Sequence, residues 1–298
     1  MDENLNSTPT PSPEIILPVN SSILICGAAR NVEKRLSEFI EKSTYAFSNF
    51  KHIEFAICES FSTDGTVRAL LDLEVECNNI TFIKDSNVID LKSKRTVKIA
   101  SAREQLRLYA LKRSQDFDYV AMMDLDGVNR GLTPRAVVSC WNHAGWDVAT
   151  ANQPFRYYDI WALRADNWSE DDCWLEYRTL LNSHTQRRAK RIAVTKKMKS
   201  ISANSKPIEV KSAFGGLAIY KIEAFVAGKY SGVNEKGEEI CEHVPFHEHL
   251  RKQGYKIFLI PSLINLNRRN QVLIQLKGFI VYIQLHLLRM KSKNDEIL

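Results

Sequence analysis

The stretch Tyr119-Val120-Ala121-Met122-Met123-Asp124-Leu125-Asp126-Gly127 is the most informative part of the chain. Its first five residues are apolar or aromatic, which predicts a strand buried on both faces of a sheet. Two carboxylates, separated by one residue, follow at once. Mg²⁺ and Mn²⁺ prefer oxygen ligands and keep coordination positions for phosphates, so such a pair can share one cation with a diphosphate. The stretch predicts a metal site at a strand end; two solvated turn residues capping a helix are the alternative.

Apolar runs on either side of this stretch alternate with segments of helical spacing. Strands that alternate with helices predict an α/β fold, Rossmann-like, with a mostly parallel central sheet flanked by helices. Pro261 is expected to end the last strand. The other predicted strands are 23–26, 53–58, 80–83, 148–151, 213–220 and 255–260, and the clearest predicted helices are 31–50, 96–113 and 242–254.

The 298 residues are expected to form one main domain between two extensions. Residues 1–20 are polar and proline-rich, which predicts a disordered leader. The main domain is expected over 21–265, with a basic insertion at about 182–206. Residues 266–298 are expected to form an amphipathic helix and tail.

Two basic segments leave alternatives open. Residues 177–208 contain no acid and carry seven lysines and arginines between 187 and 199. A solvated face is the ordinary interpretation, and an anionic partner is the alternative. The tail helix, 272–290, has a broad apolar stripe and basic ends, so it could lie on a membrane surface or pack on the domain. The net charge of +6 fits anionic substrates or a membrane surface.

Composition argues against several other classes of protein. The six cysteines form no CxxC pair, which argues against a zinc or redox site and favours a reducing compartment. No uncharged apolar run reaches the roughly 18 residues of a membrane span. The expected location is therefore the cytoplasm, with the inner face of the membrane as a candidate place for peripheral association.

Polar signals follow three of the predicted strands. They are Gly27–Arg30, Glu59–Asp64 and Asp124–Asp126. In an open α/β sheet, ligands bind beyond the carboxyl ends of the strands, near the switch in strand order. We therefore expect these three segments to meet at one site.

The order of these motifs resembles that of nucleotide-sugar glycosyltransferases of the GT-A fold, over roughly residues 21–265. The resemblance is carried by Gly27-Ala28-Ala29-Arg30-Asn31, by Glu-Ser-Phe-Ser-Thr-Asp-Gly-Thr at 59–66, by Ala102-Arg103-Glu104, and by Met-Asp-Leu-Asp-Gly at 123–127. Phe214-Gly215-Gly216 and Cys241–His247 also look like that family. The run Tyr157–Arg164 is similar to the fungal capsule-associated α-1,3-mannosyltransferases and their bacterial relatives.

The resemblance implies roles for individual residues in donor binding. Asp126 would bind the metal, and Asp124 the metal or the ribose, with Leu125 between them. Along the rest of the donor, Ala28 and Arg30 would lie beside the nucleotide, Glu59 and Asp64 would hold the base or ribose, and Arg103 would reach the phosphates or sugar.

The resemblance also implies a histidine that completes the metal shell and a carboxylate near the sugar. His247 is the first choice for the metal, with His243 and His249 as rivals. Glu242 is the candidate catalytic or sugar-orienting carboxylate. His243 stands where inverting relatives often carry a second acid, which favours a retaining mechanism.

Two further segments are candidates for contact with sugar. Asp159, with Trp161 and Arg164, forms a polar-aromatic cluster that could bind sugar or support a loop. Gly215 and Gly216 could admit a sugar close to the backbone, or form an ordinary bulge.

These inferences predict a hexosyltransferase that uses Mn²⁺ or Mg²⁺ and a GDP- or UDP-sugar donor. Its acceptor would be a hydroxyl of a glycan or lipid-linked glycan. A sugar nucleotidyltransferase is a second reading, but the loop after the first strand, at 27–30, has one glycine and no lysine. A basic nucleic-acid-binding scaffold is a third reading, although no zinc finger or RNA-recognition pattern is present.

Overall fold

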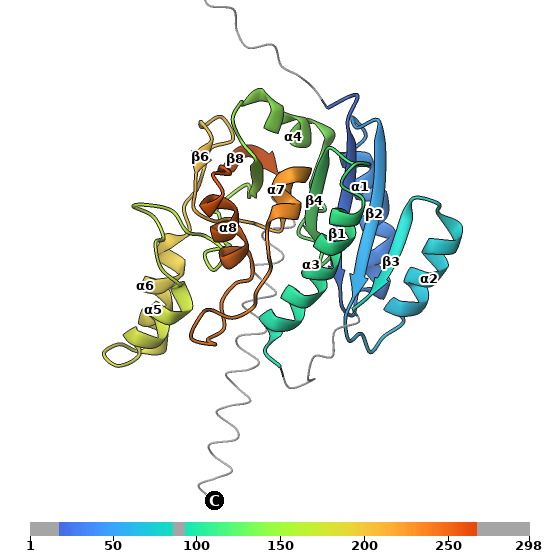
Figure 1. The fold of residues 1–298 in the computed structure, drawn as a ribbon. Helices are drawn as coiled ribbons and strands as arrows, with labels where there is room; N and C mark the ends of the chain where they lie inside the picture. The colour runs from blue at the N-terminus through green and yellow to red at the C-terminus, as the bar shows by residue number, and fades with distance from the viewer. Residues whose placement is uncertain (1–17, 86–92, 267–298) are drawn as a thin grey trace, which may run out of the picture.

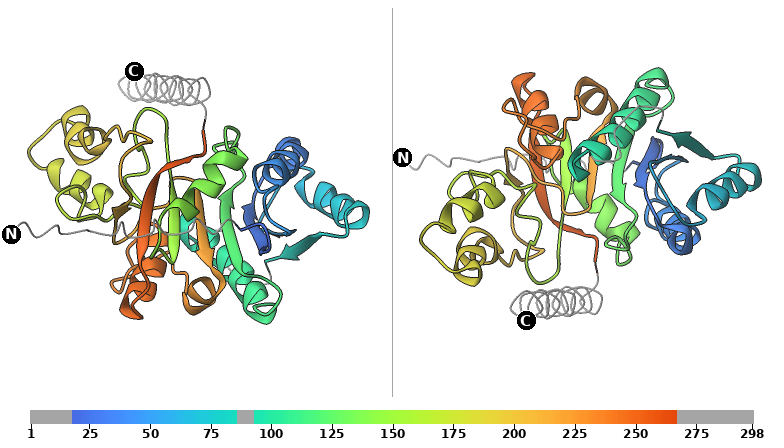
Figure 2. Two further views of the ribbon diagram at one scale, coloured as in Figure 1. Left: turned by 90° about the horizontal axis from the view of Figure 1, so that it is seen from above. Right: turned by 90° about the horizontal axis from the view of Figure 1, so that it is seen from below.

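The computed structural model describes residues 18–85 and 93–266 (Figure 1). The predicted tail helix at 272–290 and most of the predicted leader lie outside the described residues. Over the described part the chain forms a central sheet with helices packed on both faces, as the two views of Figure 2 show. This arrangement confirms the predicted α/β fold class.

The sheet has eight strands in the order β3-β2-β1-β4-β7-β5-β8-β6. β1, β2, β3 and β4 pair in parallel, as do β5 and β8. β7 runs antiparallel between β4 and β5, and β6 runs antiparallel at the edge. The strands are β1 (Ser22–Ala29), β2 (His52–Glu59), β3 (Ile80–Lys84), β4 (Tyr119–Asp124), β5 (Val148–Asn152), β6 (Ile208–Glu209), β7 (Leu217–Lys221) and β8 (Ile257–Ile264).

Side chains of each central strand alternate between two apolar cores, because successive residues of a strand face opposite sides of the sheet. In β4, Val120 and Met122 enter one core, whereas Ala121 and Met123 enter the other. The first core is covered by α3 (Arg95–Lys112), α7 (Ile222–Ala227) and α8 (His243–Lys252). The second is covered by α1 (Leu36–Ala46), α2 (Thr66–Glu76) and α4 (Pro134–Val138), with the 3₁₀ turns η1 (Glu33–Arg35) and η2 (Ser139–Asn142) beside them.

Two predicted strand boundaries were wrong. β7 begins at Leu217 instead of 213, because Gly215 and Gly216 have φ of +67° and +89°, outside the range of a strand. β8 continues through Pro261, which was expected to end it. The register between β5 and β8 shifts at this point, and a proline is tolerated at such an irregularity because its missing N–H is not needed there.

The basic segment folds in part as one arm of a helical hairpin. The hairpin comprises α5 (Cys173–Leu180), α6 (Gln186–Ala193) and the 3₁₀ turn η3 (Thr195–Lys197). Thr185 caps α6 by accepting a hydrogen bond from the Arg188 amide. The hairpin lies at the edge of the molecule, on the side away from α2 (Figure 1). No helix among the described residues has the length and apolar character needed to cross a bilayer.

Candidate nucleotide and metal site

The three polar segments predicted to meet do lie at one edge of the sheet. β1, β2 and β4 are parallel neighbours, so their carboxyl ends fall together. In the register, Ala28 lies opposite both Cys58 of β2 and Asp124 of β4. The strand pairing therefore brings residues nearly one hundred positions apart in the sequence to one place.

A cleft with an empty volume of about 870 Å³ opens above this edge. Four cations and two carboxylates line it, which is a suitable composition for a diphosphate that carries a divalent cation. The charged lining residues are Arg30, Arg95, Lys98, Arg103, Asp124 and Asp126, and Ala28, Ser60 and Leu125 lie among the others.

Arg103 is buried beneath the cleft and pairs with two carboxylates. Its Nη2 donates to Asp124 Oδ1 at 2.8 Å, and its Nη1 donates to Glu242 Oε1. The guanidinium carbon lies 4.8 Å from the centre of the Phe214 ring. Only 4% of Arg103 is exposed, and the adjacent charges of Glu242 and Asp124 raise its pKa despite burial. Arg103 therefore balances the carboxylates from below.

Asp124 is half-buried at the end of β4, where its surroundings disfavour the ionised form of the carboxyl group. Burial raises the pKa of Asp124, Arg103 opposes this, and the charges of Asp126, Glu242 and Asp159 add to the rise, which brings the pKa to about 7. Four carboxylates are thus close enough to influence one another. A bound cation would reduce this repulsion. The closeness of these carboxylates is therefore the feature that best fits a metal beside Asp124.

Asp126 and Leu125 lie in different surroundings, one exposed and the other buried. Leu125 is buried, and its Cδ1 occupies the space that a side chain at Gly27 would need. Asp126 is exposed, and its Oδ1 accepts from the Val128 amide at 3.0 Å, which orients the carboxylate in the turn. Because Leu125 fixes the turn in the core, contact between Leu125 and a nucleotide is expected through its backbone.

The described residues contain no group of three or more His, Cys, Asp or Glu side chains placed to hold a metal. Asp124 and Asp126 remain as a two-carboxylate set. That set fits Mg²⁺ or Mn²⁺, because these ions commonly take one or two carboxylates and fill their other positions with phosphate oxygens and water. It would not make a closed structural site.

His247 lies away from the aspartates, in the core below the cleft. Its Nδ1 is 3.0 Å from Ser212 Oγ and its Nε2 is 3.0 Å from Tyr220 Oη, so both ring nitrogens have hydroxyl partners. Burial and, to a smaller extent, the charge of Arg103 together lower the pKa of His247 to about 3, so the ring is neutral at physiological pH. In this structure both ring nitrogens of His247 are therefore occupied by hydroxyl groups, and metal binding by His247 stays a prediction.

The two alternative candidates for the metal-binding histidine are His243 and His249. His243 is buried, stacks on Phe214 with ring centres 3.7 Å apart, and directs Nε2 at the Arg103 guanidinium. Its Nδ1 has no hydrogen-bond partner among the residues that the structure describes. His249 lies in the last turn of α8 and is exposed.

The two candidate catalytic carboxylates differ in their surroundings. Glu242 is 6% exposed and is paired with Arg103, so it is poorly placed to exchange a proton with a substrate. Asp159 is half-buried, accepts from the Gly215 amide at 3.0 Å through Oδ2, and has a raised pKa because of burial. Asp159 is therefore the more available of the two.

The backbone conformation and the close packing at positions 215 and 216 require glycine. Both have positive φ, and a Cβ on Gly216 would lie 2.4 Å from Val128 Cγ1. A Cβ on Gly215 would lie 2.6 Å from Gln153 Nε2. The carbonyl of Gly216 accepts from the Asp124 amide at 3.0 Å, so the two glycines bring this backbone against the metal motif.

A buried amide network that the sequence did not reveal ties these pieces together. Asn129 Nδ2 donates to the carbonyls of Asp124 and Gly216, each at 2.9 Å. Asn265, at the end of β8, donates to Asn129 Oδ1 at 2.9 Å and to the Gly215 carbonyl at 2.8 Å. A buried amide that loses a hydrogen-bond partner destabilises the folded protein. The network therefore fixes the end of β4 relative to the two glycines.

The expected base-binding carboxylates shape the loop after β2. Glu59 Oε1 accepts from the Ser62 amide at 2.6 Å, across a turn in which Phe61 has φ of +59°. Asp64 Oδ1 accepts from both the amide and the hydroxyl of Thr66, which lowers the pKa of Asp64. Of this loop, Ser60 lines the cleft.

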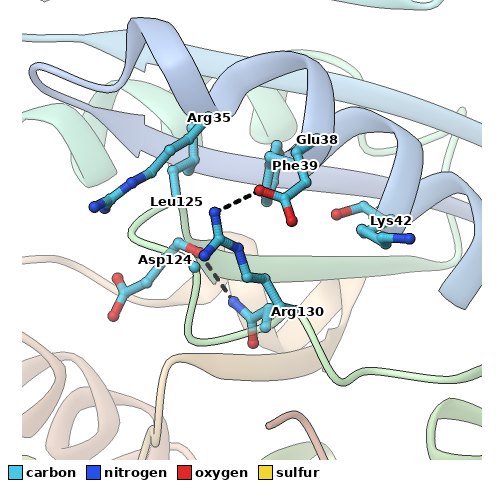
Figure 3. A pocket seen from close by; sticks show the side chains of 10 residues that line it. Arg35, Glu38, Phe39, Lys42, Asp124, Leu125 and Arg130 are labelled. Carbon is cyan, nitrogen blue, oxygen red and sulfur yellow. Dashed lines mark hydrogen bonds and ion pairs between the residues drawn. The ribbon is translucent and has the colours of Figure 1, made fainter. Parts of the chain in front are cut away.

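A second, smaller pocket lies behind the turn that carries the motif (Figure 3). Its empty volume is about 310 Å³. Arg35 Nη1 donates to the Asp126 carbonyl at 2.8 Å, and Arg130 pairs with Glu38 at 2.5 Å. In Figure 3 the Asp124 side chain points away from Arg130 and Glu38. These contacts brace the motif against α1 from the side opposite the cleft.

The remaining members of the polar-aromatic cluster support a helix. Trp161 Nε1 and Arg164 Nη2 both donate to Asp172 Oδ2, at 2.9 and 3.1 Å, while Asp172 Oδ1 caps α5. Tyr158, which the sequence analysis did not single out, borders the site instead: it is 36% exposed, and the charges of Asp159, Asp124 and Asp126 add to the rise in its pKa. No local pattern marked Tyr158, because its neighbours come from other segments.

Comparison with protein-family models and with curated proteins finds no match. Solved structures with a similar fold include the mannosyltransferase PcManGT from Pyrobaculum calidifontis in complex with GDP-Man and Mn²⁺ (14% identity, 87% of this chain and 60% of that chain, TM-score 0.47). They also include glucosyl-3-phosphoglycerate synthase from Mycobacterium tuberculosis with Mn²⁺, UDP and phosphoglyceric acid (12%, 78% and 63%, TM-score 0.41) and S. aureus TarS 1-349 (12%, 80% and 58%, TM-score 0.44). The chain thus spans about three fifths of each of these structures. Similarity at this level assigns no activity, donor or acceptor to this chain.

Proposed function

We propose that this protein is a metal-dependent glycosyltransferase that moves a hexose from a GDP- or UDP-sugar to a hydroxyl. The observation that carries the proposal is the cleft itself: Asp124, at the end of a buried strand, and Asp126, two residues further on, line it together with four cations. The two aspartates alone would repel a diphosphate. A divalent cation held by the aspartates would attract the phosphates, and the basic residues of the cleft would then add to that attraction.

The chain's own residues would divide between holding the cation and holding the phosphates. Asp124 and Asp126 would bind Mn²⁺ or Mg²⁺, which when bound neutralises the charge that develops on the leaving diphosphate. Arg30, Arg95 and Lys98 would contact the phosphate oxygens from the other wall of the cleft. Arg103 would act from below, by keeping Asp124 oriented through their 2.8 Å contact.

Among the nearby carboxylates, Asp159 is the proposed contact with the sugar or the acceptor hydroxyl. Glu242 is proposed as a positioning residue, because its carboxylate is committed to Arg103. His243 stands where an inverting enzyme would need a base. Burial lowers the pKa of His243 well below its usual value, and its ring faces Arg103. Without a base at this position, retention of configuration remains the favoured outcome.

The acceptor and the location are also proposals. A glycan or a lipid-linked glycan is the proposed acceptor, and the cytoplasm, including the inner membrane face, is the proposed location. Peripheral membrane association through the tail helix stays a prediction, since 272–290 lies outside the described residues.

The direct test is a screen of nucleotide sugars with Mn²⁺ or Mg²⁺, read by thermal shift and by donor hydrolysis. We expect stabilisation and slow hydrolysis with one GDP- or UDP-sugar, and loss of both in Asp126→Ala while the circular dichroism spectrum is retained. Asp72→Ala, which removes an exposed carboxylate on α2, is the matched control and should behave as wild type. Hydrolysis that persists in EDTA or in Asp126→Ala would reject the proposal.

A further inference from the structure

We infer that the α5–α6 hairpin is a docking surface for an anionic lipid bilayer. The surface consists of the exposed cations Arg187, Arg188, Lys190 and Arg191 of α6 and the exposed leucines Leu175 and Leu181 of α5 and its end. None of these residues lines the nucleotide cleft, so the inference does not depend on the enzymatic activity.

The first observation is the one-sided charge of α6. At about 100° per residue, the four cations cover an arc of about 160°. Ala189 and Ala193 occupy the opposite side and are fully buried against the rest of the protein. The short alanines let α6 pack closely on its neighbours, and every long side chain at the centre of its outer face is basic.

The second observation is the lack of acidic residues in the sequence around α6. No acid occurs between 177 and 208, and Lys196 and Lys199 add exposed cations just after α6. Lys197 forms an ion pair with Glu176, which lies on α5 outside this stretch. Each cation near an anionic membrane surface contributes favourably to binding, and several together make a strong site.

The third observation is the exposure of leucine on the other arm of the hairpin. Leu175 is 46% exposed at the centre of the outer face of α5, between Arg178 and Thr179, and Leu181 is 40% exposed just after the helix. Single exposed leucines are ordinary, but two beside a basic helix match an interfacial surface, in which apolar groups enter the bilayer and cations meet the headgroups.

This combination favours a bilayer over a nucleic acid. Single-stranded nucleic acids are held by exposed aromatic rings on which bases stack, in addition to cations. The large exposed side chains of the hairpin are aliphatic, and Trp174 and Tyr177 pack edge to face on each other, with ring centres 5.8 Å apart. They are therefore not arranged as open stacking platforms.

The hairpin is firmly attached, so the surface is preformed. Asp172 caps α5 and is held by Trp161 and Arg164. After α6, the Lys197 carbonyl accepts from Trp168 Nε1 at 2.7 Å. A preformed surface binds without a large ordering cost. The hairpin lies at the edge of the molecule in Figures 1 and 2, where a flat bilayer could reach it.

The test is co-sedimentation of the full chain with vesicles of phosphatidylcholine alone or mixed with phosphatidylglycerol. We expect binding to the mixed vesicles only, and a loss of affinity of at least about tenfold in the double variant Arg187→Glu with Arg191→Glu. The control, Lys51→Glu with Lys112→Glu, makes the same change in net charge at exposed positions outside the hairpin and should bind like wild type. Circular dichroism checks that each variant is folded.

A second variant tests the apolar part of the surface. Leu175→Ser with Leu181→Ser should bind normally at low salt but lose binding sooner than wild type as salt screens the charges. Three results would overturn the inference: no binding of wild type to anionic vesicles, equal binding by the hairpin and control charge variants, or binding of a mixed-sequence RNA in place of vesicles.

Discussion

Arg103 is a buried cation between two carboxylates, and its contacts set the charge of the candidate site. Burial of a charge is tolerated only when partners satisfy it, and removal of one partner leaves the others uncompensated. Glu242 comes from the start of α8, 139 residues further along the chain, and Asp124 from the end of β4. Arg103, on α3, therefore joins the end of β4 to the start of α8 through one side chain.

Replacement of Arg103 should destabilise the protein by more than the loss of one hydrogen bond would. We expect Arg103→Gln to lower the free energy of unfolding by about 3–5 kcal/mol, because Glu242 is left buried without its cation. Arg95→Gln removes an exposed cation of the same cleft and should change stability by less than about 0.5 kcal/mol while weakening nucleotide binding. Urea unfolding of both variants makes the comparison, and equal stability would contradict the role given to Arg103.

Asp124 should make metal binding depend on pH near neutrality. Its pKa of about 7 lies above the value in the unfolded chain, so folding favours the protonated form. As pH rises from about 4 to 7, the unfolded chain releases this proton first, and the metal-free protein loses stability across that window. The metal needs the ionised carboxylate, and its binding should therefore improve as pH rises through 7.

A titration with Mn²⁺ at two pH values measures this effect. Ionisation of a group with a pKa of about 7 changes by roughly tenfold between pH 6 and pH 8, and the affinity for Mn²⁺ should rise by about the same factor. In Asp124→Asn the dependence should disappear together with most of the affinity. A pH-independent affinity in the wild type would show that Asp124 is not a ligand.

The turn between β4 and α4 and the entry to β7 form one packed unit at the site. Asn129 and Asn265 hold the carbonyls of this unit, while Leu125 fills the space above Gly27. The metal motif is thus positioned by backbone contacts and not only by its own side chains. Changes that leave both aspartates in place should still disturb the site.

Gly216→Ala tests this dependence on the backbone. Its φ of +89° and a Cβ only 2.4 Å from Val128 Cγ1 should together cost about 2–4 kcal/mol and reduce Mn²⁺ binding. Gly237→Ala is the control, because its φ is +72° but nothing lies within 4 Å of the added Cβ. It should cost about 1–2 kcal/mol and leave metal binding unchanged. Equal effects of the two on Mn²⁺ affinity would argue against a packed unit.

Across the whole molecule, patterns local in sequence predicted the sheet well. Runs of apolar residues marked each long strand, and the end of β4 fell on Asp124 as expected, because both depend on neighbouring residues. The start of β7 was missed because the positive φ of Gly215 and Gly216 depends on how closely Gln153 and Val128 approach.

The site was less predictable than the fold. His247 sits at a helical position typical of a ligand, yet Ser212 and Tyr220 from other elements enclose it. Asn265 matters because β8 runs past Pro261, which the sequence suggested would end the strand. Such roles depend on contacts between distant segments, and no single segment carries their signal.

The account rests on one cation that joins Asp124 and Asp126 to a nucleoside diphosphate. The most direct measurement is calorimetric titration of GDP and of UDP into the wild-type protein, with Mn²⁺ and again with EDTA, at pH 8. We expect saturable one-to-one binding of one nucleotide with Mn²⁺, none with EDTA, and none in the folded Asp126→Ala protein. Equal nucleotide affinity with and without the metal, or unchanged affinity in Asp126→Ala, would contradict the account.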